Sequence, residues 1–209
     1  MNLVALASGP PWLNRSARSK RPAAATAAVA ANITNIPNQH LASPQRALGI
    51  DYGRQRIGVA VSTLGLAPRP LSSLRGGGLD EVYDIAKRVV ELAASEQADS
   101  IVIGLPVTLN GNLRKRSTDS EQGRRCRYFA DMVASIVASN GSTGYSPNTF
   151  LVNERGTTVD AESILREGGH RDRRVVKKKA DSVAAALILV TFFADPSQAL
   201  LVRPRRTTI

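Results

Sequence analysis

The sequence predicts an α/β fold in which a β-sheet of mixed strand direction is flanked by helices. Two apolar, β-branched runs joined by a short turn begin the folded part of the chain, a pattern typical of an antiparallel hairpin. Helical and strand-like patterns then alternate toward the C-terminus, which is typical of parallel strands connected by helices. A hairpin followed by such units indicates a single sheet that contains both strand directions.

The hairpin begins at Ala47, where the pattern changes abruptly from polar to apolar. The runs ALGIDY and RIGVAVST lie on either side of the turn GRQ, and both have the length of strands. A third extended segment is expected around residues 70–74, before a run of three glycines. From Leu79 apolar residues recur at helical spacing, which predicts a helix that ends near Gln97.

Two further strands are predicted from the continuous apolar runs IVIGLP at 101–106 and TFLVNE at 149–154. Runs of this kind are typical of strands that are buried on both faces. A short helix at 159–167, which ends at two glycines, and a last helix at 180–194 complete the predicted domain.

The segment that follows the predicted strand at 101–106 is strongly basic. Residues 108–125 contain almost no large apolar side chain and several turn-forming residues, so we expect an exposed loop that leads into a helix. Phe129, Met132 and Ile136 then mark the apolar face of that helix.

The net charge of the chain indicates a polyanionic partner. The 209 residues hold 28 Lys and Arg against 17 Asp and Glu, a net charge of +11. Residues 1–46 contribute five basic residues and no acid, which leaves 23 basic against 17 acidic residues, a net charge of +6, for residues 47–209. Because the excess persists in the folded part, nucleic acid is the expected partner.

The composition before the hairpin differs from the rest of the chain. Residues 1–45 are basic, rich in alanine and free of acid, which is typical of an organelle transit peptide; a disordered tail is the alternative. We expect a plastid rather than a mitochondrion, and the cytoplasm if this segment is not a transit peptide. The predicted organisation is this leader, a domain at 46–196 and a basic tail at 197–209.

The composition also excludes several classes of protein. The longest predominantly apolar stretch, 183–194, contains only Thr191 as a polar residue and is shorter than the roughly 20 residues that a membrane-spanning helix needs, so no membrane partner is expected. One cysteine and two histidines rule out an internal disulfide, a cysteine zinc site and a His-rich metal centre. Any catalysis is therefore expected to depend on carboxylates.

Three acidic residues differ from the others in their neighbours. Asp51 follows ALGI, Glu154 follows FLVN, and Asp181 precedes an almost wholly apolar helix. An acid at the edge of a buried element loses hydration unless a positive group compensates it. A single magnesium or manganese ion can supply this positive charge to several carboxylates, because both ions prefer hard oxygen ligands. The three carboxylates therefore predict a cation site.

Each acid also has an ordinary structural explanation. Asp51 can accept hydrogen bonds from the turn backbone at Tyr52, Glu154 can pair with Arg155, and Asp181 can interact with the dipole at the start of its helix. These explanations would all have to hold at once for a strand-end Asp, a strand-end Glu and a helix Asp in this order, which is harder to accept than any one of them.

Four motifs in this order carry a resemblance. GIDYGRQRIGVAVS, IVIGLPVTLNG, NERGTT and KKADSVAAALIL resemble the YqgF family, the RuvX-type branch of the RuvC-like nucleases with the RNase H fold. The resemblance covers about residues 46–194 and places Asp51, Glu154 and Asp181 on the family's acidic positions. It implies a five-stranded mixed sheet flanked by helices, metal-dependent phosphodiester cleavage and a role in maturing precursor small-subunit (16S) ribosomal RNA.

The chain departs from the family pattern in two places. The family usually has Asp where this chain has Asn153, which removes one charge but leaves Glu154 in place. Residues 112–125 are also more basic and longer than the corresponding loop of the family.

The expected mechanism is attack of water on a phosphodiester, with one or two magnesium ions held by Asp51, Asp181 and Glu154. Gly53 and Gly58 fit a tight turn that phosphate can approach, or plain hairpin geometry.

The expected nucleic-acid contacts are basic side chains on both sides of these acids: Arg114, Lys115, Arg116, Arg155, Lys177, Lys178 and Lys179. With nine aromatic residues, recognition is expected through backbone and shape, and a solvated basic turn is the alternative for Lys177–Lys179.

Three other functions are alternatives to an RNA nuclease. An actin-like or hexokinase-like ATPase needs a second domain that this chain is too short to hold. A nuclease that cuts four-way DNA junctions uses the same carboxylates, and a non-catalytic ribosome-assembly factor that binds RNA or the small ribosomal subunit uses the same basic surface. Metal-dependent cleavage by the protein, with Asp51→Asn as control, distinguishes the enzyme from the assembly factor.

Overall fold

The computed structural model describes residues 44–76, 81–108, 111–140, 144–154 and 173–204, with the side chains of 173–178 left out. Inter-residue contacts divide the chain into the units Met1–Ser43 and Pro44–Ile209, and all described residues belong to the second. Of the sequence predictions, nearly all of the leader, the short helix at 159–167, Arg155 and the side chains of Lys177 and Lys178 lie outside the described residues.

The described domain is built on one mixed sheet. Its long strands are β1 (Arg46–Tyr52), β2 (Arg56–Thr63), β5 (Ser100–Leu105) and β6 (Asn148–Asn153). β1 and β2 pair antiparallel as the predicted hairpin, whereas β5 runs parallel to β1 and β6 runs parallel to β5. The α/β class and the mixed strand direction are thus confirmed.

Three two-residue strands extend this sheet to seven strands, where five were expected. β3 (Arg69–Pro70) and β4 (Leu74–Arg75) both pair with β2, so the predicted extended segment at 70–74 is split in two. Pro70 has no N–H to continue the ladder. β7 (Leu200–Leu201) pairs antiparallel with β6, and the sheet therefore continues into the segment predicted as a tail.

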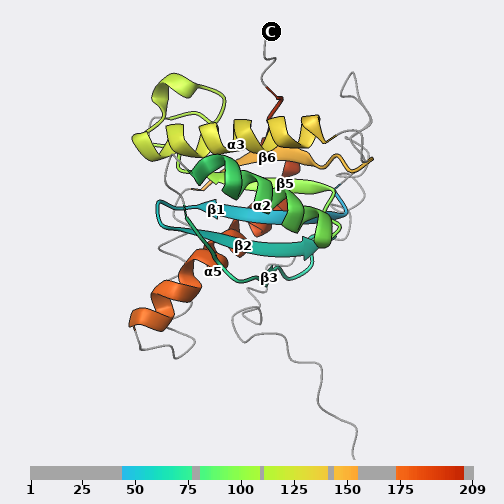
Figure 1. The fold of residues 1–209 in the computed structure, drawn as a ribbon. Coiled ribbons are helices and arrows are strands. Elements are labelled where there is room, and N and C mark those ends of the chain that lie inside the picture. The colour runs from blue at the N-terminus through green and yellow to red at the C-terminus, as the bar shows by residue number, and fades with distance from the viewer. Residues whose placement is uncertain (1–43, 77–80, 109–110, 141–143, 155–172, 205–209) are drawn as a thin grey trace, which may run out of the picture. The chain divides into compact units, whose positions relative to one another are not determined.

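Helices cover both faces of the sheet (Figure 1). α2 (Val82–Ser95) and α3 (Glu121–Ser139) share one apolar core with the sheet, and α5 (Arg173–Ala194) packs on the opposite face in a second core. Two 3₁₀ turns, η4 (Arg116–Thr118) and η6 (Pro196–Gln198), lie in the connections. No helix in the described part of the chain is long and apolar enough to span a membrane.

Two helices begin earlier than the apolar pattern predicts. α3 begins at Glu121, inside the segment expected to be a loop, because the Ser120 side chain caps it by accepting a hydrogen bond from the Gly123 N–H (3.0 Å). α5 begins at Arg173 instead of residue 180, so its first turns are basic rather than apolar. Asp181 therefore lies about two turns inside α5, and the explanation through the dipole at the helix start is wrong.

α5 approaches the hairpin closely because two strand positions lack side chains. A Cβ atom on Gly58 of β2 would lie 1.8 Å from the Asp181 carbonyl oxygen, and one on Gly49 of β1 would lie 2.6 Å from the Ala185 carbonyl oxygen. Gly58 pairs with Asp51 across the hairpin. The glycine expected in a turn thus lies within a strand, where it lets the Asp181 backbone approach the strand partner of Asp51.

Candidate active site

The three predicted acids meet at one edge of the sheet. Asp51 is near the carboxyl end of β1, Glu154 follows β6, and Asp181 comes from α5 on the sheet face next to Gly58. β1 and β6 are both parallel to β5, so their carboxyl ends lie at the same edge. The Glu154 N–H donates to the Leu105 carbonyl at the end of β5 (2.9 Å), which fixes Glu154 at this edge.

The acids interact strongly with one another. Burial, the charges of Glu154 and Asp181, and a hydrogen bond between the Asp51 and Glu154 carboxyl groups raise the pKa of Asp51 to about 8. A shift in this direction means that Asp51 holds a proton at neutral pH, because neighbouring like charges and burial disfavour its ionised form. The Oδ2 atom of Asp181 is buried as well. The site is thus a concentrated, partly protonated group of carboxyl oxygens.

A glycine on the central strand makes room for Glu154. A Cβ atom on Gly104 of β5 would lie 2.6 Å from the Glu154 Oε2 atom and 2.5 Å from the Ile188 Cδ1 atom. From the apolar pattern alone, Gly104 is only one residue of a buried strand. A glycine inside an apolar strand signals the close approach of another group, and that signal could have identified it.

Asn153, which directly precedes Glu154, differs from the three acids in its exposure. Its side chain is exposed, whereas Glu154 is half-buried. The change from the family's usual aspartate therefore leaves all three buried or half-buried acids in place.

The donor set fits a hard cation in its chemistry. Asp51, Glu154 and Asp181 offer only carboxyl oxygens, the ligands that magnesium and manganese prefer. Cys126, also close to these acids, is no thiolate donor, because burial and the charges of Glu154 and Asp51 raise its pKa. As they stand, no three Asp, Glu, His or Cys side chains among the described residues are arranged around a common ion position. Binding a cation thus requires Asp51 to release its proton and the Asp51–Glu154 hydrogen bond to open.

The first turns of α3 hold the end of β1 in place. The Gln122 Nε2 atom donates to the Tyr52 carbonyl oxygen (2.7 Å), one residue beyond Asp51. The Tyr52 ring stacks on Phe129, with 4.2 Å between ring centroids. Sequence reasoning missed Gln122, because the contact joins segments 70 residues apart.

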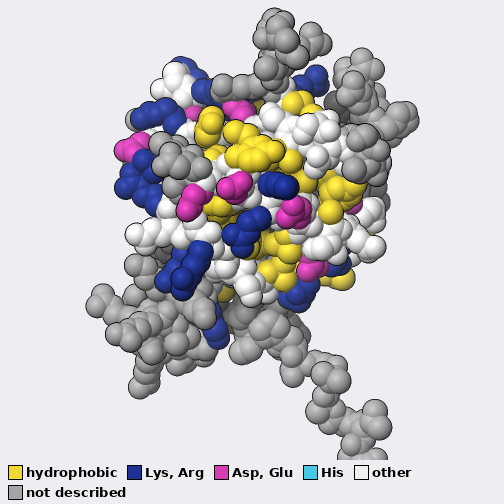
Figure 2. All heavy atoms as spheres, in the orientation of Figure 1, with side chains coloured by type: hydrophobic (Ala, Val, Ile, Leu, Met, Phe, Trp, Pro, Cys, Tyr) yellow, Lys and Arg dark blue, Asp and Glu magenta, His cyan; other side chains and the backbone are white. Residues whose placement is uncertain are grey.

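Basic side chains gather beside the start of α3 (Figure 2). Arg114, Lys115 and Arg116 are exposed, as predicted, and Arg116 also makes two hydrogen bonds with Asp131 of α3 (3.0 and 3.1 Å). Their segment is anchored by Arg127, which pairs with the buried Asp119 and donates to the Leu113 carbonyl (2.7 Å).

The predicted basic loop is therefore a fixed segment that presents Arg114 and Lys115 to solvent. Lys179, from the other predicted basic cluster, is exposed on α5.

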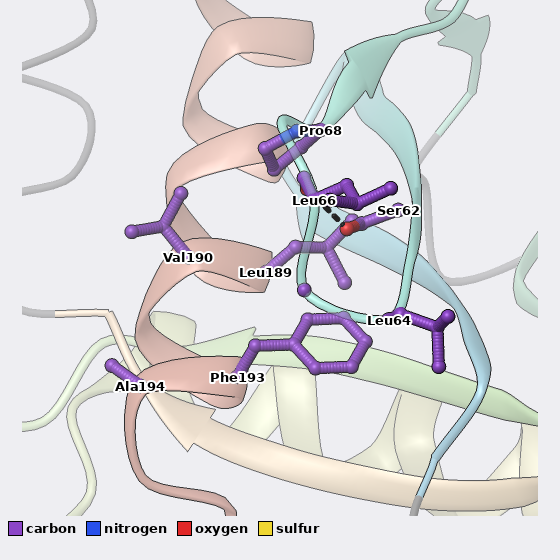
Figure 3. A pocket seen from close by; sticks show the side chains of 9 residues that line it. Ser62, Leu64, Leu66, Pro68, Leu189, Val190, Phe193 and Ala194 are labelled. Atoms are coloured by element: carbon purple, nitrogen blue, oxygen red, sulfur yellow. Dashed lines mark hydrogen bonds between the residues drawn. The ribbon is translucent and has the colours of Figure 1, made fainter. Parts of the chain in front are cut away.

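A separate hollow of about 320 Å³ lies at the opposite edge of the sheet, between the loop after β2 and the end of α5 (Figure 3). Its lining is almost entirely apolar and includes Leu64, Leu66, Leu189 and Phe193. None of its lining residues is charged. This hollow is therefore unsuited to a phosphodiester substrate, and the chemistry belongs at the acidic edge.

The fold and the site together define an α/β protein with a mixed sheet, helices on both faces, three acids at the carboxyl edge and basic side chains beside them. The family model described as RuvX, Holliday junction resolvase, matches residues 45–195. The chain belongs to this family.

Relatives agree with this membership. A protein of Chromohalobacter salexigens is 35% identical over 154 residues, which cover 71% of this chain and 88% of the relative. A protein of Chromobacterium violaceum is 34% identical over 155 residues, which cover 73% of this chain and 100% of the relative. Both bear the name of a candidate pre-16S rRNA nuclease. The solved structure of T. thermophilus RuvC with a Holliday junction substrate covers 76% of this chain and 99% of its own, at 16% identity and a TM-score of 0.46.

Proposed function

We propose that this protein is a metal-dependent nuclease that hydrolyses phosphodiester bonds in RNA, with precursor small-subunit ribosomal RNA as its substrate. The observation that carries the proposal is the convergence of Asp51, Glu154 and Asp181, with the pKa of Asp51 raised to about 8. Acids that are crowded together and strongly perturbed are typical of catalytic sites. The names of the relatives favour precursor 16S rRNA as the substrate.

Asp51, Glu154 and Asp181 would hold magnesium or manganese. The ion, when bound, supplies positive charge that stabilises the attacked phosphate. To serve as a ligand, Asp51 would give up the proton that it holds in the free protein, and the Glu154 carboxylate would share the ion with it. Gly104 makes room for the Glu154 carboxyl group at this edge, since a Cβ atom there would lie 2.6 Å from the Glu154 Oε2 atom. Exposed basic side chains, Arg114, Lys115 and Lys179 among them, bind the substrate backbone.

The test is a cleavage assay with the full-length protein. Labelled precursor rRNA and a four-way DNA junction are each incubated with magnesium, with manganese or with a chelator. We expect cleavage of the RNA with either metal, none with the chelator, and none by Asp51→Asn. Asp99→Asn is the matched control, because Asp99 is a half-buried acid at the opposite edge of the sheet. If the protein binds the RNA without cutting it, the result would contradict the nuclease and favour a non-catalytic assembly factor.

Cleavage of DNA junctions is the second candidate function. The family model that matches this chain is described as a Holliday junction resolvase. Preferential cutting of the junction in the same assay would favour this activity over RNA processing.

The organelle location rests on the leader alone. Residues 1–45 are basic and free of acid, and they direct the protein to a plastid in this proposal. A reporter fused to these residues should enter plastids. A diffuse cytosolic signal would contradict this location without affecting the nuclease proposal.

A further inference from the structure

Two arginines from different elements meet on one carboxylate at the acidic edge. The Oε1 atom of Glu121 accepts hydrogen bonds from Arg54 (2.9 Å) and from Arg125 (3.0 Å). Arg54 belongs to the turn between β1 and β2, three residues after Asp51, whereas Glu121 and Arg125 belong to the first turns of α3. The sequence separates Arg54 from Glu121 by 67 residues, so the fold brings them together.

This group of three, the Arg54–Glu121–Arg125 triad, lies close to the acids. Gln122, next to Glu121, donates to the Tyr52 carbonyl. Burial and the charge of Cys126 raise the pKa of Tyr52, and the charge of Arg125 is near enough to offset part of this rise. Cys126, next to Arg125, is near enough to Glu154 and Asp51 for their charges to raise its pKa. The two guanidinium groups are therefore at the border of the acidic site.

The triad is held together weakly enough to open. The side chains of Arg54 and Glu121 are 63% and 62% exposed, and that of Arg125 is 28% exposed. Exposed ion pairs contribute little to stability, so a competing anion can displace the carboxylate at little cost. Two guanidinium groups and one carboxylate leave an excess of one positive charge. Guanidinium groups match the oxygens of a phosphate through paired hydrogen bonds.

We infer that Arg54 and Arg125 bind one backbone phosphate of the nucleic-acid strand whose neighbouring phosphodiester lies at Asp51, Glu154 and Asp181. Glu121 occupies the place of this phosphate in the free protein and is displaced when the strand binds. This inference rests on the proposed function, because it assigns the path of the strand into that same site. It makes Glu121 a competitor of the substrate rather than a part of the catalytic machinery.

A second triad provides a matched control. At the opposite edge of the sheet, Glu96 accepts hydrogen bonds from Arg46 (2.7 Å) and Arg69 (3.1 Å). Here the carboxylate is only 20% exposed and Arg46 is 34% exposed, so the pair is better shielded from solvent. Arg46 is also tied to Thr63 by a hydrogen bond of 2.9 Å. The same residue types therefore form a structural clamp far from the acids.

The experiment measures binding of a fluorescently labelled single-stranded RNA to the full-length protein by anisotropy, with a chelator present to prevent cleavage. Arg54→Gln and Arg125→Gln should each weaken binding about 10-fold and reduce the slope of log K against log salt by roughly one. Glu121→Gln should tighten binding about 3-fold, because it removes a competing negative charge. Glu96→Gln should leave affinity unchanged, and melting curves should show all four variants folded.

The outcomes separate this inference from the proposed function. If the wild-type protein binds neither the RNA nor a four-way DNA junction, the proposed function fails. If it binds RNA while Arg54→Gln and Arg125→Gln keep the wild-type affinity and salt slope, the triad is structural and only the inference fails. Weaker binding by Glu121→Gln would also overturn the inference, because Glu121 would then orient the arginines instead of competing for them.

Discussion

The two edges of the sheet use similar acids in opposite ways. At the amino edge of the parallel strands, Asp99 accepts hydrogen bonds from the Gln45 N–H (2.7 Å), the Arg46 N–H (3.0 Å) and the Ser100 hydroxyl (2.7 Å). At the carboxyl edge, Asp51 faces Glu154 and Asp181 and shares a hydrogen bond with another carboxyl group. One edge pairs each acid with donors, and the other edge concentrates acids against one another.

The pKa values of the two edges shift in opposite directions. Burial alone would raise the pKa of Glu96, but hydrogen bonds from Arg46 and Arg69, together with their charges, hold it below its usual value. Burial and neighbouring carboxylates raise the pKa of Asp51 to about 8. An acid that hydrogen-bond donors satisfy stabilises the fold, whereas an acid crowded by other acids destabilises it. The difference distinguishes a structural edge from a functional edge by charge alone.

The largest expected effect is on cleavage. Asp51→Asn and Asp181→Asn should each lower the cleavage rate by at least about a thousand-fold. Each removes a charged oxygen ligand from the proposed cation site, whose positive charge would stabilise the attacked phosphate. Asp99→Asn should lower stability and leave the rate per folded molecule nearly unchanged. Initial rates and melting curves for all three variants make the measurement. Equal loss of activity in Asp99→Asn would break the distinction between the edges.

The next effect concerns the packing that brings Asp181 to Asp51. Gly58→Ala should destabilise the protein by roughly 1–3 kcal/mol, or about 2–12 °C in melting temperature, because its Cβ atom would overlap the Asp181 carbonyl. Gly104→Ala should retain more stability and lose cleavage, since it meets the flexible end of Glu154 and the tip of Ile188. Calorimetry and cleavage rates on both variants test this order.

Gly144→Ala is the control for these two glycine substitutions. Gly144 has a φ of +75° but nothing within 4 Å of an added Cβ atom, so its replacement reports only backbone strain. A loss of stability in Gly144→Ala as large as that in Gly58→Ala would contradict the packing explanation.

Sequence reasoning recovered what depends on neighbouring residues. The hairpin, β5, β6 and α2 follow from local apolar periodicity, and the three acids stood out because each borders an apolar run. The start of α3 was missed because its first turn is polar and Ser120, not an apolar residue, marks its beginning.

Contacts between distant segments could not be predicted from the sequence. The pairing of Arg116 with Asp131, the hydrogen bond from Gln122 to Tyr52 and the packing of Gly58 against Asp181 each join different elements. No local pattern specifies these partners, so basic residues predicted as nucleic-acid contacts, such as Arg116, also proved to have protein partners.

A smaller effect appears in the pH dependence of stability without metal. Asp51 has a pKa of about 8 when folded and an ordinary value of 3.8, so between these values the folded protein binds more protons than the unfolded one. Stability should therefore fall as pH rises from about 4 to 8. Asp51→Asn should remove this dependence and melt a few degrees higher than wild type at neutral pH, with no difference near pH 4.

Magnesium should reverse the same trend. Adding the ion at neutral pH should raise the melting temperature of the wild-type protein, because a ligand that binds only the folded state stabilises it. Asp51→Asn should show little of this gain. If the variant gains as much as wild type, the ion binds elsewhere and the carboxyl edge is not its site.

The smallest effect is expected at the amino edge, where Glu96→Gln removes a carboxylate with a lowered pKa. A lowered pKa contributes stability above the ordinary value of 4.5, and this contribution disappears as pH falls through the folded value. At neutral pH the substitution should reduce stability by about 1 kcal/mol, because both arginine partners are partly solvated and an ion pair of this kind contributes little more. Below the folded pKa of Glu96, wild type and Glu96→Gln should melt at nearly the same temperature. Thermal melts from pH 3 to 8 on Glu96→Gln and Asp51→Asn should thus give differences from wild type that grow with pH in both variants but have opposite signs. Two differences of the same sign would show that the acids at the two edges do not differ in the way their surroundings indicate.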